Sequence, residues 1–163
     1  MIPRQARSQA WRSRIEILHK WSGPMELWLA MRIGSWAMVL PFLVMFMPLP
    51  SLARLMWTST TRANGDPGRP ERIIEFINWI YRSRRLTTRD RCLERGLLLY
   101  RYLSRYNRDP RLIVGFRKDG KDLLGHAWVT TDGRPIDETP IALDGFSTVL
   151  VFGPRGSVQV PSA

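Results

Sequence analysis

The chain has 163 residues, of which 44% are hydrophobic, and a formal net charge of +11 at pH 7. This length suits one ordinary domain with a short extension, and the hydrophobic content supports a packed core and argues against general disorder. A single cysteine excludes an intramolecular disulfide framework and fits a reducing, cytoplasmic compartment.

Residues 1–57 form a basic and hydrophobic region that we expect to be helical. Within it, residues 33–53 carry no charged side chain and are bracketed by Arg32 and Arg54. A run of this length can cross a hydrocarbon core about 30 Å thick. Tryptophans near its limits suit a membrane interface: Trp28, Trp36 and Trp57.

Three prolines oppose a continuous spanning helix through this run: Pro41, Pro48 and Pro50. We therefore favour a helical hairpin that is membrane-associated or partly buried over a true span. The expected location is the cytoplasm, with association at the inner face of the cell membrane.

Residues 58–69 are rich in Thr, Gly, Asn and Pro and are interpreted as a linker to a core domain at 70–155. Pro70 suits the first position of a helix over residues 71–85. A second helix is predicted to carry Cys92 in its first turn, capped by Thr87, Thr88 or Asp90. Its apolar stripe consists of Leu93, Leu97, Tyr100 and Leu103.

The remaining core is predicted to be a small antiparallel sheet of three or four strands, which makes the fold class α+β. Strands are expected at residues 111–116, on both sides of the Asp132-Gly133 turn, and at 147–152. Residues 156–163 are expected to form a flexible tail.

The Asp132-Gly133 turn sets a register in which Thr131 faces Arg134 and Trp128 faces Asp137. With alternating side chains, His126 then shares one face with Trp128 and Asp137. A bulge would break this parity and make Glu138 the competing carboxylate.

Cys92, His126 and Asp137 together are typical of a cysteine acyl-transfer site. The helix start, with Arg89 and Arg91 beside it, favours the reactive thiolate. His126 would accept the thiol proton and Asp137 would orient the imidazole, while the backbone N–H of Cys92 would stabilise the oxyanion. The alternative is that Cys92 is a small buried residue, His126 a strand histidine and Asp137 a turn residue.

Two stretches, GHAWV at 125–129 and DGRPIDE at 132–138, make residues 92–152 resemble the transglutaminase-like cysteine peptidases of lasso-peptide biosynthesis, the B proteins. The resemblance implies a papain-like core, with the nucleophile at a helix N-terminus packed on a small sheet. It also implies that Cys92, His126 and Asp137 are nucleophile, base and orienting acid.

The same resemblance implies an activity and its partners. That family removes the leader from a ribosomally made precursor peptide, and a partner cyclase then closes the ring. Because residues 1–57 lack the pattern of the family's fused recognition domain, a separate leader-recognition protein is implied. We expect no cofactor and no metal, since no Cys/His cluster or phosphate loop has the required spacing.

The positive charge leaves several interpretations open. Arginines are concentrated between residues 82 and 111, which suits a solvated helix face, an anionic membrane surface, an acidic peptide substrate or nucleic acid. No nucleic-acid motif accompanies the charge, so nucleic acid is not expected as a partner. The remaining functional alternatives are another transglutaminase-like acyltransferase or deamidase, and a non-catalytic membrane or nucleic-acid binding module.

Overall fold

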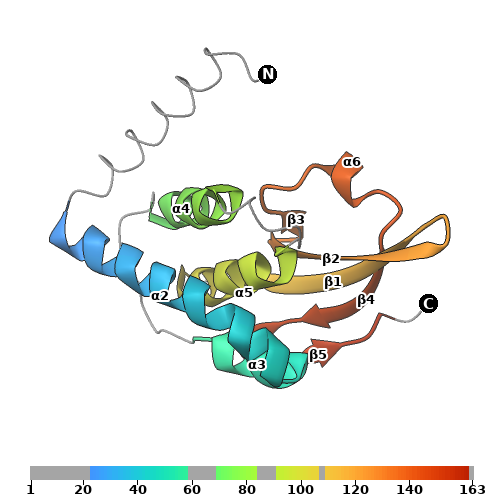
Figure 1. The fold of residues 1–163 in the computed structure, drawn as a ribbon, viewed down its shortest axis with the longest axis horizontal. Helices are drawn as coiled ribbons and strands as arrows, with labels where there is room; N and C mark the ends of the chain where they lie inside the picture. The colour runs from blue at the N-terminus through green and yellow to red at the C-terminus, as the bar shows by residue number, and fades with distance from the viewer. Residues whose placement is uncertain (1–22, 59–68, 84–90, 107–108, 162–163) are drawn as a thin grey trace, which may run out of the picture.

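The computed structural model describes residues 23–58, 69–83, 91–106 and 109–161. The predicted lead-in at 1–22, most of the 58–69 linker and the proposed caps Thr87, Thr88 and Asp90 lie outside these residues. The elements form an α+β fold in which helix α5 lies between the other long helices and the sheet (Figure 1).

Two helices form the N-terminal part of the described chain: α2, Pro24–Phe46, and α3, Leu49–Met56. Pro41 lies inside α2 without ending it, whereas Pro48 separates the two helices. Pro50 falls in the first turn of α3, where a missing N–H removes no intrahelical bond. Two helices thus lie in the N-terminal region that was expected to be helical, and its association with a membrane stays a prediction.

The next two helices follow the expected apolar periodicities: α4, Arg69–Ser83, and α5, Cys92–Leu103. Helix α5 is buried on all sides from Gly96 to Leu103, because α2, α3 and α4 cover the surface that the sheet leaves open. Helices α2 and α3, which the sequence analysis placed in a separate N-terminal region, contribute Ile33, Leu40 and Leu52 to this same core.

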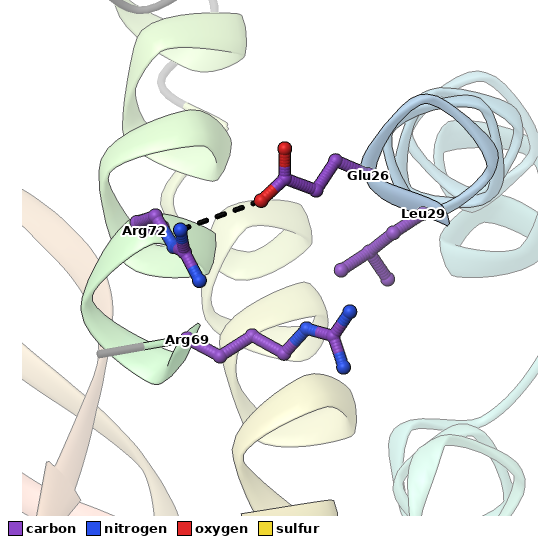
Figure 2. Close-up of a pocket in the computed structure, with 4 residues that line it drawn as sticks. All are labelled: Glu26, Leu29, Arg69 and Arg72. Atoms are coloured by element: carbon purple, nitrogen blue, oxygen red, sulfur yellow. Dashed lines mark ion pairs between the residues drawn. The ribbon is translucent and has the colours of Figure 1, made fainter. Parts of the chain in front are cut away.

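An ion pair fastens the start of α2 to α4. Arg72 Nη1 lies 3.3 Å from Glu26 Oε1, at the rim of a small hollow that Leu29 and Arg69 also line (Figure 2). None of the predicted site residues lines this hollow.

The sheet is antiparallel with the strand order β3-β2-β1-β4-β5. Its strands are β1, Arg111–Asp119; β2, Asp122–Thr131; β3, Arg134–Pro135; β4, Ser147–Phe152; and β5, Val158–Gln159. Short helical turns lie at Ser104–Tyr106, at Pro140–Leu143 (α6) and at Pro154–Gly156. The sequence predicted three or four strands, which correspond to β1 to β4, and β5 is the additional strand.

The segment from residue 156, expected to be a flexible tail, adds the edge strand β5. The turn at Pro154–Gly156 reverses the chain, and Gly153 N donates a hydrogen bond to Ser157 O at 2.8 Å. Val158 then pairs with Phe152 of β4. Backbone hydrogen bonding to β4 holds Val158 and Gln159. The pattern of side chains in the sequence does not predict this pairing.

Candidate active site

Cys92 is the first residue of α5 and is partly exposed while packing against the core. Arg91 precedes it at the cap position, and its side chain makes no capping hydrogen bond. Backbone N–H groups at such a helix start have no intrahelical partner, and their partial positive charge favours an anion. The predicted placement of the cysteine at a helix N-terminus is therefore confirmed.

Gly96, one turn after Cys92, lets α5 approach the sheet closely. A Cβ at this position would lie 2.8 Å from Leu112 Cδ1 and 3.9 Å from the carbonyl oxygen of Ala127. Ala127 directly follows His126 in β2, so the first turns of α5 lie over the part of the strand that carries the histidine.

His126 lies within an aromatic cluster on β2. Its ring stacks on Trp128 with centroids 5.9 Å apart and also contacts Phe146 at 5.5 Å. Gly115 pairs with His126 across β1 and β2, and a Cβ there would meet the Trp128 ring at 2.9 Å. Since Ala127 belongs to the core beneath α5, alternation directs His126 and Trp128 to the opposite face of the sheet.

A carboxylate pairs with this histidine, and it belongs to Glu138. His126 Nε2 lies 3.5 Å from Glu138 Oε1, and the same oxygen accepts a hydrogen bond from Arg95 Nη1 at 2.8 Å. The Glu138 side chain is only 14% exposed, which strengthens its interactions with both partners. Glu138 is the residue that the sequence allowed as competitor if the strand register broke.

Strand β3 ends at Pro135, and the predicted register continues only as far as the Ile136 N–H. The predicted pairs Thr131–Arg134 and Thr130–Pro135 are confirmed, and Ile136 N still donates to Val129 O at 2.9 Å. Asp137 then adopts a positive φ of 55°, which turns the chain out of the extended conformation.

The expected pairing of Asp137 with Trp128 is therefore wrong, because strand β3 ends at Pro135. Asp137 Oδ2 lies 3.3 Å from Arg95 Nη2, and its side chain is 35% exposed. The assignment of Asp137 as the orienting acid stays a prediction.

Sequence reasoning missed Arg95 as a member of this site. Its guanidinium contacts both carboxylates, and its Nε donates to Asn78 Oδ1 of α4 at 2.7 Å. Arg95 thus connects the first turn of α5 with α4 and with the segment after β3. The available signal is its position one helical turn after Cys92, although in the sequence it is one of many arginines in a basic run.

The described residues contain no cluster of three or more His, Cys, Asp or Glu side chains arranged to hold a metal ion. In this part of the chain, the arrangement offers a thiol at a helix start, an imidazole with a carboxylate partner, and an arginine that holds that carboxylate. These are the groups that acyl transfer through a thioester uses.

Residues 36–151 match the family described as the transglutaminase-like superfamily, so the chain belongs to this superfamily. Its members include cysteine peptidases and acyltransferases, and they are typically cysteine-dependent enzymes. The match begins inside α2 and ends in β4, so it includes helices of the N-terminal region. No curated protein and no solved structure matches the chain.

Proposed function

We propose that this protein is a cysteine peptidase that removes the leader from a ribosomally synthesised precursor peptide during lasso-peptide maturation. Membership of the transglutaminase-like superfamily supports the cysteine chemistry, and the GHAWV and DGRPIDE stretches support the leader-peptidase assignment. The observation that supports the proposed cysteine chemistry is a chain of contacts: Arg95 of α5 binds Glu138, and Glu138 in turn contacts His126.

In this proposal the Cys92 thiolate attacks the carbonyl carbon that joins leader to core. The backbone N–H of Cys92 stabilises the resulting oxyanion. As the C–N bond breaks, the protonated His126 gives its proton to the departing amine, which becomes the core N-terminus. Water, deprotonated by His126, then hydrolyses the leader thioester and regenerates the thiol.

One carboxylate must hold the His126 ring and stabilise its charged form. The 3.5 Å distance between His126 Nε2 and Glu138 Oε1 favours Glu138 for this role, and the family resemblance assigns it to Asp137. Strand β3 ends at Pro135, so beyond it no strand of the described chain borders β2 on that side. Cys92 lies on helix α5, which covers one face of the sheet, and the His126 side chain extends from the other face. We therefore propose that the thiol and the imidazole meet around this edge of β2.

The proposed partners are the precursor peptide, a separate leader-recognition protein and the cyclase that uses the freed amine. A second candidate function is acyl transfer to an amine or deamidation of a glutamine, since the superfamily also includes acyltransferases. Both share the thioester at Cys92 and differ only in the second nucleophile.

Mass spectrometry of a cognate precursor, incubated with this protein and its recognition partner, tests the proposal. Free leader and free core should appear with the wild type and not with Cys92→Ala. Because Cys92 is the only cysteine, alkylation by iodoacetamide should abolish cleavage in the same way. A mass change on an intact precursor would indicate acyl transfer or deamidation, and cleavage by Cys92→Ala would exclude the proposed nucleophile.

A further inference from the structure

Helix α2 presents a largely apolar surface to solvent along one side. The exposed side chains on this side recur at helical spacing and, apart from Ser35, are large and apolar. We call these apolar residues the apolar stripe: Trp28, Met31, Met38, Val39, Phe42, Met45 and Phe46. A contiguous apolar surface of this kind on a folded domain marks an interaction site.

The one polar side chain within the apolar stripe is satisfied by its own helix. Ser35 Oγ donates to the carbonyl oxygen of Met31 at 2.7 Å, so it does not require water. No charged residue occurs between Ile33 and Ala53. The side chains on this side of the helix therefore bring no unpaired polar group into contact with hydrocarbon.

The opposite side of α2 is part of the protein core. Ile33 and Leu40 are fully buried, and the Trp36 ring lies 4.2 Å from the guanidinium carbon of Arg101 on α5. The Arg72–Glu26 ion pair holds the start of the helix to α4 (Figure 2). Helix α2 is long and apolar enough to cross a membrane. If it crossed, however, α5 would lose its packing contacts with α2.

The charge of Arg32 and of the sequence that precedes α2 favours an anionic surface over a neutral one. Arg32 lies at its beginning, with its guanidinium carbon 4.5 Å from the centre of the Trp28 ring. Five basic residues and one acidic residue precede α2 in the sequence: Arg4, Arg7, Arg12, Arg14, Lys20 and Glu16. Cations next to an apolar helix face are typical of helices that lie in the plane of an anionic bilayer.

We propose that the folded protein docks on an anionic lipid bilayer through the apolar stripe, with α2 lying in the plane of the membrane. The buried side of α2 stays in the core, so docking requires no unfolding. The inference is independent of the proposed function, because it concerns neither Cys92 nor His126.

Co-sedimentation of the full chain with vesicles tests the docking surface. Binding to phosphatidylglycerol-containing vesicles should fall about tenfold or more in the double variant Met38→Asp/Phe42→Asp, since two apolar side chains that would insert into the bilayer become charged. The matched control is Leu123→Asp in the β1–β2 hairpin, because Leu123 is 67% and Phe42 66% exposed. The control should bind like the wild type, and Cys92→Ala should also bind normally.

Circular dichroism confirms that each variant is folded. Equal binding by the double variant would overturn the docking surface, and equal binding to purely phosphatidylcholine vesicles would overturn the anionic preference. A dimer that forms without lipid and is lost in the double variant, together with absent vesicle binding, would assign the stripe to a second copy of the chain instead.

Insertion depth tests the orientation. Spin labels at single cysteines replacing Met31, Met38 and Met45, in a Cys92→Ser background, should report similar shallow depths. A profile in which position 38 lies much deeper than positions 31 and 45 would show a spanning helix and overturn the in-plane proposal.

Discussion

Glu138 Oε1 lies between an imidazole and a guanidinium, 3.5 Å from His126 Nε2 and 2.8 Å from Arg95 Nη1. Arg95 also reaches the adjacent Asp137, so the arginine divides its donors between neighbouring carboxylates. The chain turns at Asp137, where φ is 55°, and Glu138 directly after it is the carboxylate that lies 3.5 Å from His126.

Replacing Glu138 by Gln should impair catalysis more than replacing Asp137 by Asn. Glu138→Gln retains shape but loses the charge that holds His126, and loss of an orienting acid lowers kcat about 10²- to 10⁴-fold. Asp137→Asn should cost about tenfold or less, because an exposed ion pair contributes little. The measurement is kcat/KM for cleavage of the precursor.

The two variants serve as each other's matched control, since both change a carboxylate to its amide beside Arg95. A larger loss in Asp137→Asn would return the orienting role to Asp137, as the family resemblance implies. Equal and small losses would show that neither carboxylate orients the base.

Arg95 should act as a positioning residue. Arg95→Met leaves Glu138 without its arginine partner and Asn78 Oδ1 without its 2.7 Å donor, and we expect a stability loss of about 1–3 kcal/mol because these groups are partly buried. The loss in kcat should exceed the change in KM. Arg95→Lys should recover part of kcat, because it restores charge without the two-pronged geometry.

A merely structural role for Arg95 predicts a different result. In that case kcat per folded molecule, measured with urea-denaturation curves beside the kinetics, would match the wild type for both variants.

The helix periodicities, the Asp132-Gly133 hairpin and the start of α5 at Cys92 were all predictable, because each depends on a local pattern. The identity of the acid beside His126 was not, since one backbone φ at Asp137 overrides the alternation rule. Arg95 was also missed, because its three partners come from distant segments of the chain.

The extent to which α5 is buried was also not predictable from a local sequence pattern. The sequence predicts one apolar stripe on this helix, and Leu97 and Tyr100 lie on it as expected. Leu98, Leu99 and Tyr102 are also buried, because α2, α3 and α4 cover the rest of the helix. That cover depends on long-range packing, which periodicity within a single helix does not contain.

Two helical glycines provide a matched test of how closely α5 approaches the sheet. Gly96→Ala would place a Cβ 2.8 Å from Leu112 Cδ1 in the core, and we expect a loss of about 1–3 kcal/mol in the free energy of unfolding. In Gly34→Ala of α2 the new Cβ meets nothing within 4 Å, so higher helix propensity should stabilise the protein by up to about 1 kcal/mol.

Thermal and urea denaturation measure both changes, and precursor cleavage should fall only in Gly96→Ala, where the added methyl separates α5 from β2. A neutral Gly96→Ala would show that α5 is not in close contact with Leu112.

Tyr100 should make the fold sensitive to alkali. Its hydroxyl donates to Gly153 O and accepts from Gly156 N at 3.1 Å, joining α5 to the turn after β4. Burial raises the pKa of Tyr100 from 10.0 to about 12, and the hydrogen bond from Gly156 offsets part of the shift. A group whose pKa is raised on folding contributes stability that is complete below its unfolded pKa and is lost as pH rises towards the folded value.

The window for this loss is therefore pH 10 to about 12. Near pH 8, Tyr100→Phe should be less stable than the wild type by about 1 kcal/mol, because the two hydrogen bonds of the Tyr100 hydroxyl are lost. Above pH 10 the wild type should lose up to about 1.4 kcal/mol per pH unit more than Tyr100→Phe. Urea denaturation of both proteins from pH 8 to pH 11 measures this difference. Because Tyr102 is present in both, parallel pH profiles would mean that ionisation of Tyr100 does not limit the alkaline stability of the fold.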